Sequence, residues 1–332
     1  MAIGVINQAI GERYALYNGD SAEVLKNIPD DSIHYSIFSP PFASLYTYSN
    51  SERDLGNCRT TEEFYQQFKY IVAELYRVIM PGRLLSFHCM DLPLTKERDG
   101  VIGIRDFRGE LIRLFQESGF ILHSQVCIWK DPVIAMQRTK AIGLLHKQLK
   151  KDSAISRQGI PDYLVTMRKP GANPEPVTHT NESFPVAIWQ KYASPIWTDI
   201  NPSDTLQASS ARDEKDERHI CPLQLTVIRR ALNLWTNHDD IVLTPFLGIG
   251  SESYVALELG RRTIGIELKI NDPADSNVLW DAVDAGLHEM WCAAWGSTID
   301  PDMYQVYHSS NIVGEGGSDS NHYHIRSAEL DQ

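Results

Sequence analysis

The chain has 332 residues, of which 42% are hydrophobic, so it has enough apolar side chains to fill one large core or two modest ones. That composition argues against an intrinsically disordered protein. No apolar run approaches the roughly 20 residues that a membrane-spanning helix needs, and the first residues lack the basic and apolar segments of a signal peptide. We therefore expect a cytoplasmic protein without a membrane partner.

Net charge and cysteine content narrow the class of ligand. The net charge of −12 at pH 7 argues against indiscriminate binding to phosphate backbones, because a uniformly negative surface repels nucleic acid. The five cysteines are scattered and form no C-x-x-C pair or Cys/His comb, so we expect reduced thiols and no metal site.

The first 130 residues alternate between strand and helix patterns, which predicts an α/β layered fold. The apolar strand at 33–38 must end at Pro40, since proline lacks the N–H that a strand ladder requires. Apolar residues at a 3.6-residue period then predict a helix from Thr61 that Pro81 and Gly82 close. The other predicted elements are a helical turn at 21–25, a helix at 106–118, and strands at 14–17, 84–89 and 120–129.

The regular alternation fails between residues 131 and 206, where prolines multiply and only 163–167 has the pattern of a strand. We interpret this stretch as an inserted region. Nine basic and three acidic side chains lie between residues 130 and 169, so this segment is the one that can face DNA despite the acidic total.

Regular patterns return near Pro222, which predicts the start of a helix. A strand at 241–243, a glycine-rich turn, a helix at 251–259 and a strand at 263–266 then form a βαβ unit. Residues 277–295 predict an amphipathic helix that covers the core. Residues 310–332 have the composition of a flexible tail.

The glycine-rich turn of this unit is Pro245-Phe246-Leu247-Gly248-Ile249-Gly250. A strand, a turn with spaced glycines and a helix N-terminus let a cofactor approach backbone N–H groups closely. Glu267 ends the next strand, where a carboxylate can accept hydrogen bonds from both ribose hydroxyls. The turn and the carboxylate together predict an adenosine-containing cofactor.

A second motif, Ser39-Pro40-Pro41-Phe42, follows the strand at 33–38. The Ser39 hydroxyl and the Pro40 carbonyl can both accept hydrogen bonds from an exocyclic NH₂ group, which localises a lone pair that is otherwise delocalised into the base. The prolines fix the backbone, and Phe42 offers a ring on which an extruded base can stack. The motif therefore predicts chemistry at an amino group.

With the Pro-Phe-x-Gly-x-Gly turn far downstream of Ser-Pro-Pro-Phe, the chain resembles the beta group of DNA amino methyltransferases. Asn18-Gly19-Asp20 resembles the family's motif whose acid meets the adenine of the cofactor. The resemblance implies a Rossmann-like fold, S-adenosylmethionine as cofactor, catalytic residues Ser39, Pro40, Pro41 and Phe42, and cofactor-binding residues Asp20, Pro245, Phe246, Gly248, Gly250 and Glu267. It also implies that the variable stretch at 131–206 recognises double-stranded DNA.

The sequence departs from the family at one position. Many members carry an acidic residue immediately before Pro-Phe, whereas Thr244 stands here, so the expected contact is either made by the Thr244 hydroxyl or lost. An initial serine is similar to the cytosine-N4 enzymes and an initial aspartate to the adenine-N6 enzymes, and Ser39 favours cytosine slightly.

Further residues are predicted to serve the substrate. The polar loop at 44–54 can close over an extruded base, and a simple exposed loop is an equal alternative. His88, at the end of its strand, either lies in the site or is a core histidine, and we favour the core. The predicted substrate-binding residues are Tyr46, Arg53, Arg138, Lys140 and Lys147.

We thus predict a stand-alone, metal-independent DNA methyltransferase that acts as a monomer or homodimer. Two alternatives stay open, namely a catalytically weak DNA-binding protein on the same fold and a methyltransferase acting on RNA or another amino substrate. The predicted units are a catalytic half (1–130), a target-recognition insertion (131–206), a cofactor-binding half (207–275), a helical extension (276–309) and a tail (310–332).

Overall fold

A computed structural model describes residues 3–42, 54–58, 60–132, 150–155, 158–206 and 223–268, and the backbone of 307–308 and 323–324. The helices are α1 (Ser21–Val24), η1 (Leu25–Asn27), η3 (Leu55–Asn57), α2 (Thr61–Val78), α3 (Lys96–Asp99), α4 (Phe107–Glu117), η4 (Ser153–Ile155), α7 (Val186–Tyr192), α8 (Leu225–Trp235) and α9 (Ser251–Glu258). The strands of the main sheet are β1 (Val5–Ile10), β2 (Tyr14–Gly19), β3 (Ile33–Phe38), β4 (Ile79–Met90), β7 (Ile121–Ile128), β8 (Asp162–Arg168), β9 (Ile196–Trp197), β10 (Ile241–Thr244), β11 (Arg262–Glu267), β12 (Tyr307–His308) and β13 (Tyr323–His324). A small separate sheet pairs β5 (Leu92–Leu94) with β6 (Gly103–Arg105).

The main sheet has 11 strands in the order β12-β13-β1-β2-β11-β10-β3-β4-β8-β7-β9. Its five central strands, from β2 to β4, all run parallel. Strand β8 runs antiparallel to both of its neighbours, β4 and β7. The predicted α/β fold with a mostly parallel, Rossmann-like sheet is therefore confirmed.

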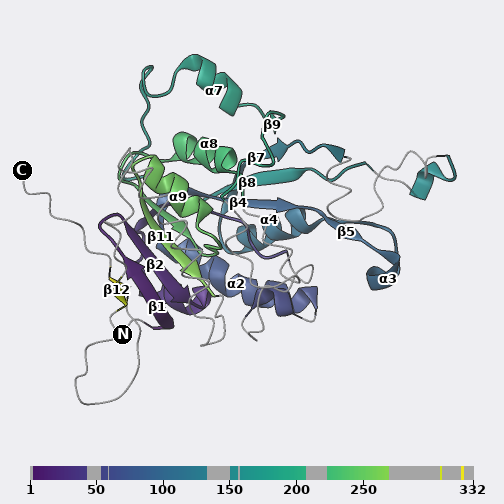
Figure 1. Cartoon of the computed structure of the whole chain (residues 1–332), viewed down its shortest axis with the longest axis horizontal. Helices are drawn as coiled ribbons and strands as arrows, with labels where there is room; N and C mark the ends of the chain where they lie inside the picture. Colours follow the sequence, from purple (N-terminus) through teal and green to yellow (C-terminus); the bar gives the residue numbers. More distant parts are fainter. Residues whose placement is uncertain are drawn as a thin grey trace, which may run out of the picture.

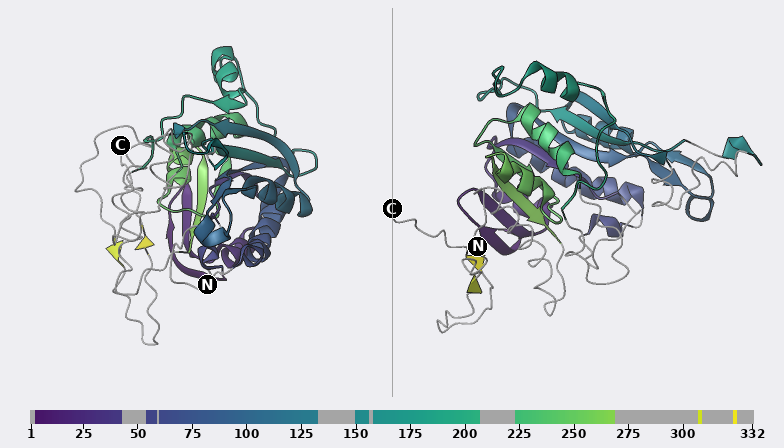
Figure 2. Two further views of the ribbon diagram at one scale, coloured as in Figure 1. Left: turned by 90° about the vertical axis from the view of Figure 1, so that its right-hand side faces the viewer. Right: turned by 45° about the horizontal axis from the view of Figure 1, so that its top comes forward.

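Helices cover both faces of the sheet (Figure 1). Helices α2 and α4 pack over one face through a cluster of aromatic and aliphatic side chains that includes Phe64, Phe68 and Phe115. Helices α8 and α9 cover the other face, where Ile228 and Val255 belong to a second apolar cluster. Burying both faces explains why β3 is buried along its whole length. Helix α7 has no buried residue and stands away from the sheet (Figure 2).

The chain turns in opposite directions from the two middle strands. From β10 it passes through α9 to β11 on one side, and from β3 it passes through α2 to β4 on the other. Strands β10 and β3 are themselves hydrogen-bonded neighbours, with Leu243 opposite Ser36. In open α/β sheets, such a reversal leaves a crevice at the carboxyl ends of the two strands, where ligands bind.

The predicted end of the helix from Thr61 and the predicted start of the helix near Pro222 differ from the structure. Helix α2 ends at Val78, and Pro81 and Gly82 lie inside β4 rather than closing the helix. They fall where the pairing of β3 with β4 shifts register, and proline and glycine are tolerated at such an irregularity because ladder hydrogen bonds are interrupted there. Helix α8 begins at Leu225, and Pro222 lies outside the described residues.

The stretch interpreted as an insertion contributes to the main sheet through β8 and β9. Lys169, one of its nine basic residues, is buried and donates to Asp31 at 2.6 Å and to the Ile79 carbonyl at 2.8 Å, so it stabilises the fold and does not face DNA.

Part of the predicted tail forms β13 beside β1. The division of the chain into five units stays a prediction, and residues 277–295 lie outside the described part.

The described residues also allow the expectations about membrane-spanning helices and cysteines to be compared with the structure. No described helix is both long and apolar enough to cross a bilayer, and the predicted cytoplasmic location stays a prediction. Of the five cysteines, Cys58, Cys89 and Cys127 are described, and each carries a free thiol.

Candidate active site

The carboxyl ends of the central parallel strands place six chain segments at one edge of the sheet. Strands β2, β11, β10, β3 and β4 all end there, and the antiparallel β8 begins there at Asp162. The two motifs predicted to carry the chemistry follow β3 and β10, which are neighbours. The strand topology therefore brings the serine motif and the glycine turn to the same edge.

The glycine turn after β10 has a backbone that favours glycine. Gly248 and Gly250 have φ angles of +53° and +88°, in the left-handed region that other residues rarely adopt. A Cβ at either position would meet nothing closer than 4.0 Å. Gly248 is exposed, so its surroundings leave room for a ligand to approach the backbone. Gly250 is the N-cap of α9, whose N-terminus faces the turn.

Glu267 and Asp20 flank this turn from β11 and β2. One Glu267 carboxylate oxygen accepts a hydrogen bond from the Gly248 amide at 2.7 Å, which ties the strand tip to the turn. Asp20 caps α1 by accepting from the Ala22 amide at 2.9 Å. The next residue, Ser21, donates to the Pro245 carbonyl, so the segment that carries Asp20 is fastened to the glycine turn.

Aromatic rings join the glycine turn to the strand that precedes the serine motif. Phe246 is half-buried, and its ring centroid lies 5.7 Å from that of Phe38, the last residue of β3.

Thr244, before Pro245, is fully buried, and its hydroxyl oxygen has no hydrogen-bond partner among the described residues. In the structure this hydroxyl is thus free to meet a polar group.

The serine motif leaves β3 at Ser39, which is partly exposed at the sheet edge. Pro40 is buried, whereas Pro41 and Phe42 are half-buried. The Phe42 ring lies 6.3 Å from that of Phe107 on α4, which limits its movement. The motif therefore presents a hydroxyl and an aromatic ring at the edge where the parallel strands end.

His88 lies beside the serine motif, which was the less favoured of its two predicted positions. Its Nδ1 atom is 3.2 Å from Ser39 Oγ, and its Nε2 atom is 3.1 Å from Asp162 Oδ2. Lys130, after β7, forms an ion pair with the same Asp162 oxygen. Burial raises the pKa of the Asp162 carboxyl, but His88 and Lys130 outweigh this effect and leave it below its usual range.

Comparison with known proteins identifies the family. Residues 33–272 match the model of a family described as DNA methylase, which covers both N6 and N4 enzymes. The chain belongs to this DNA methylase family. Over 266 residues it is 24% identical to the type II beta methyltransferase M.BslI of Bacillus sp., and this match covers 78% of the chain and 26% of the relative. The chain thus spans about a quarter of the length of that enzyme.

Two solved structures share the fold. The Thermus thermophilus protein TTHA0409, named as a DNA modification methylase and solved with S-adenosyl-L-methionine, has a TM-score of 0.59 and 22% identity, covering 84% of this chain and 96% of its own. The PvuII DNA methyltransferase, described as cytosine-N4-specific, also has a TM-score of 0.59, with 16% identity over 86% of this chain and 96% of its own. The Rossmann-like methyltransferase fold is therefore confirmed.

The residues at this edge of the sheet fit S-adenosylmethionine, the cofactor that the DNA methylase family implies. Gly248 exposes backbone where a Cβ would have open space, and the Glu267 carboxylate lies against it. The buried hydroxyls of Thr244 and Ser251 lack hydrogen-bond partners among the described residues. Polar groups of a bound cofactor could supply these hydrogen bonds. These residues, with Asp20 and Phe246, would hold the cofactor.

One further acid, Glu252, lies in the first turn of α9. Glu252 is 5% exposed, and burial, with a smaller effect from the negative charge of Glu267, raises its pKa to about 8. At neutral pH this carboxyl is therefore mostly protonated. Sequence reasoning missed this residue, because an acid in the first turn of a helix is ordinarily solvated.

The predicted substrate-binding residues lie outside the described part of the chain. These residues are Tyr46, Arg53, Arg138, Lys140 and Lys147. Their roles stay predictions.

A cluster of His34, Glu175 and Asp240 is the one group of three potential metal ligands within the described residues. His34 Nδ1 accepts from the Ile241 amide at 3.1 Å, so the ring proton is on Nε2, which donates to Glu175 at 3.0 Å. Arg83 pairs with Asp240 in the interior. With both nitrogens engaged and a guanidinium on the carboxylate, this cluster is a structural network of hydrogen bonds and ion pairs.

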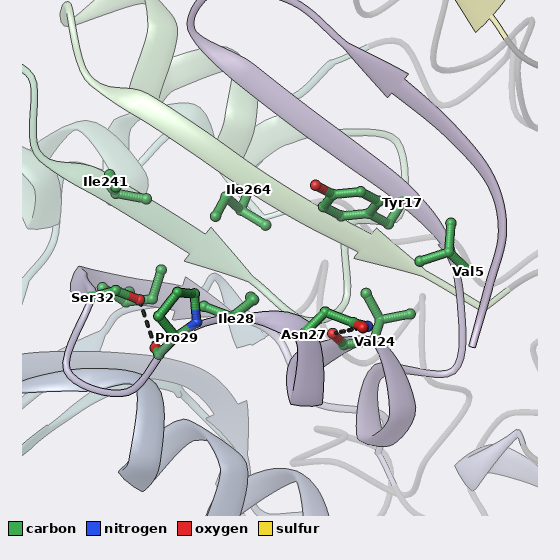
Figure 3. A pocket seen from close by; sticks show the side chains of 10 residues that line it. Val5, Tyr17, Val24, Asn27, Ile28, Pro29, Ser32, Ile241 and Ile264 are labelled. Atoms are coloured by element: carbon green, nitrogen blue, oxygen red, sulfur yellow. Dashed lines mark hydrogen bonds between the residues drawn. The ribbon is translucent and has the colours of Figure 1, made fainter. Parts of the chain in front are cut away.

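A cavity of about 300 Å³ lies on one face of the sheet (Figure 3). Ile241 and Ile264 line it from β10 and β11, and Val24 and Asn27 line it from the opposite side. No charged side chain lines it, and its strand residues include the first of β3 and of β10. The cavity is therefore separate from the edge that carries Ser39 and the glycine turn.

Proposed function

We propose that the chain is a site-specific DNA methyltransferase that transfers a methyl group from S-adenosylmethionine to the exocyclic amino group of a flipped base. The observation that carries the proposal is the pairing of β3 with β10, because it brings Ser39 and the Gly248 turn to one edge of the sheet. Both groups that a methyl transfer needs, an acceptor for the amine and a cradle for the donor, then lie side by side.

The residues of the chain divide the work. Bound S-adenosylmethionine supplies an electrophilic methyl group on a sulfonium centre. Glu267 and the Gly248 backbone orient the adenosine end, and Asp20 meets its adenine. Ser39 Oγ and the Pro40 carbonyl accept hydrogen bonds from the NH₂ group, which directs its lone pair at the methyl group and stabilises the positive charge that develops on nitrogen. Phe42 stacks on the base.

The target atom is N4 of cytosine in preference to N6 of adenine. The preference rests on the serine that begins the motif, because the family resemblance associates an initial serine with cytosine enzymes. Cytosine-C5 chemistry needs a thiolate nucleophile, usually in a Pro-Cys pair, and the order at residue 221 is Cys-Pro.

The partner is double-stranded DNA, bound by a monomer or homodimer. The basic residues between 130 and 169 supply the phosphate contacts in an otherwise acidic chain. Lys150, Lys151 and Arg168 are exposed, as such contacts require.

One experiment tests the function and the target atom together. The protein is incubated with tritiated S-adenosylmethionine and genomic DNA, and the DNA is digested to nucleosides. Label in N4-methyl-2′-deoxycytidine supports the proposal in full, and label in N6-methyl-2′-deoxyadenosine corrects the base. In a parallel incubation with RNA, transfer to RNA alone would assign the enzyme to RNA. In a separate calorimetry experiment, undetectable binding of S-adenosylmethionine would favour a DNA-binding protein that lacks catalysis.

A double variant tests the roles of the serine motif. Ser39→Ala with Pro40→Ala should abolish methyl transfer and leave the cofactor dissociation constant within a factor of about two. Ser32→Ala is the matched control, because Ser32 is a serine at the other end of the same strand whose hydroxyl donates to the Pro29 carbonyl at 2.7 Å. Undiminished turnover in the double variant would overturn the assignment.

A further inference from the structure

Three neighbouring strands bring a serine, a histidine and an aspartate into one row at the active-site edge. Phe38 of β3 pairs with Phe87 of β4, so the next residues, Ser39 and His88, lie side by side. Asp162 begins the antiparallel β8, which is the other neighbour of β4. The row therefore runs across the sheet from Ser39, the proposed acceptor of the amino group, in the direction of β9.

The distances within the row suit proton transfer. Ser39 Oγ lies 3.2 Å from His88 Nδ1, and His88 Nε2 lies 3.1 Å from Asp162 Oδ2. The second contact has the length of an ion pair without the alignment of a good hydrogen bond. Catalytic hydrogen bonds of ligand-free enzymes are commonly long or poorly aligned and tighten when substrate binds.

Burying polar groups without hydrogen-bond partners lowers the stability of the fold, so this row calls for a functional explanation. Asp162 is 2% exposed and His88 is 9% exposed. Asp162 Oδ1 and His88 Nε2 are among the few buried polar atoms that lack a hydrogen-bond partner within the described residues. Buried polar groups normally have hydrogen-bond partners, and a catalytic role is one physical reason for an exception.

The charge of Asp162 selects the histidine tautomer. A carboxylate beside Nε2 favours the proton on that nitrogen, which leaves Nδ1 as an acceptor that faces the Ser39 hydroxyl. When Ser39 donates its own proton to Nδ1, both lone pairs of its oxygen can accept from an NH₂ group. A serine hydroxyl alone is a weak proton acceptor, and the neighbouring imidazole removes that weakness.

Resting on the proposed function, we propose that His88 is the terminal acceptor of the proton released by methyl transfer, with Ser39 as the relay and Asp162 as the positioning residue. The amino nitrogen forms its bond to the methyl carbon as the C–S bond breaks, and the electron pair of that bond goes to sulfur. The amino proton passes to Ser39 Oγ while the Ser39 proton passes to His88 Nδ1. The resulting imidazolium is stabilised by the Asp162 carboxylate.

The groups around the row are compatible with this role. Lys130 pairs with Asp162 from the end of β7 and keeps the carboxyl ionised. The thiols of Cys89 on β4 and Cys127 on β7 also feel the Asp162 charge, and burial raises the pKa of each, so both stay neutral at neutral pH. The Arg108 guanidinium from α4 lies 4.1 Å from the centre of the Tyr163 ring.

The test compares single-turnover rates of methyl transfer for wild type and His88→Asn between pH 5.5 and 8.5. An asparagine oxygen can replace Nδ1 as a hydrogen-bond acceptor but cannot take a proton. We expect the rate to fall by roughly 10²- to 10⁴-fold and the acid limb of the wild-type pH profile to disappear, as for the loss of a general base. Imidazole added to His88→Ala should restore part of the rate.

Asp162→Asn should lower the rate as well, and it should shift the ¹⁵N resonances of His88 away from the Nε2–H tautomer, a readout that needs no turnover. Thr166→Val is the matched control. It removes a buried hydrogen bond from a second row across the same three strands, in which Tyr35 bonds Ser86 and Ser86 bonds Thr166 at 2.8 Å. We expect its pH profile to match the wild type.

The outcomes separate the two proposals. An active wild type with an equally active His88→Asn variant would overturn the relay and leave the proposed function standing. A wild type that methylates no nucleic acid would overturn both. Wild-type ¹⁵N shifts that place the proton on Nδ1 would overturn the relay whatever the turnover.

Discussion

The Glu267 carboxylate accepts a hydrogen bond from the Gly248 amide, with 2.7 Å between Oε2 and the amide nitrogen. The residue predicted to bind the cofactor ribose therefore also holds the glycine turn in place. Glu267→Gln keeps the shape of the side chain and removes its charge. Hydrogen bonds to charged groups contribute about 1.5–3 kcal/mol, so we expect S-adenosylmethionine to bind roughly 10- to 100-fold more weakly in calorimetry.

The control for this prediction is Glu258→Gln. Glu258 ends α9 and pairs with Arg229 at 2.8 Å on the helical layer, away from the strand tips. It should leave cofactor affinity unchanged. Equal affinities for wild type and Glu267→Gln would remove Glu267 from the cofactor site.

Gly248→Ala separates backbone strain from loss of a ligand contact. Gly248 and Gly100 both have positive φ angles, +53° and +73°, and at both a Cβ would meet nothing within 4 Å. The cost of alanine at either position is therefore conformational, about 1–2 kcal/mol in urea unfolding. We expect both variants to lose this stability but only Gly248→Ala to bind S-adenosylmethionine more weakly. A Gly100→Ala protein with equally weakened binding would contradict the assignment.

Much of the active-site edge follows from the sequence because its signals are local. Ser39-Pro40 ends a strand through the missing N–H of proline, and Gly248 and Gly250 indicate a turn through their conformational freedom. Neither local signal places the two segments next to each other, and the register of β3 with β10 shows that they are neighbours.

Asp162 illustrates what the sequence does not reveal. It stands one residue before a predicted strand, in a stretch interpreted as an insertion, where an acid is ordinarily a solvated surface group. Its importance arises because β8 returns antiparallel beside β4 and delivers the carboxylate to His88, 74 residues earlier in the chain. Such a pairing depends on long-range strand order, which local periodicity does not encode.

Asp240→Asn should destabilise the protein without affecting the cofactor. Asp240 pairs with Arg83 in the interior, and the two side chains are 5% and 2% exposed. Removing one charge of a buried pair leaves the other uncompensated, so we expect the free energy of unfolding to fall by about 3–5 kcal/mol.

The adjacent Asp239 offers a matched control for this change. It pairs with Arg13 at 2.6 Å on the surface and is 59% exposed, and its φ of +64° is one that asparagine also accepts. Asp239→Asn should lower the free energy of unfolding far less than Asp240→Asn, because exposed ion pairs are screened by solvent. Similar losses in the two variants, measured by urea unfolding, would show that burial of the Asp240 pair is energetically unimportant.

Glu252 should make stability depend on pH. Burial raises its pKa in the folded protein to about 8, whereas an unfolded chain binds this proton only below about 4.5. Between these values the folded state holds more protons than the unfolded state, so stability falls as pH rises, by up to about 1.4 kcal/mol per pH unit from this group. Glu252→Gln has no proton to lose. In urea titrations from pH 5 to pH 8, the unfolding free energy of the wild type should therefore fall steadily relative to that of Glu252→Gln. If the unfolding free energies of the two proteins change with pH in parallel, Glu252 ionises at its ordinary pKa.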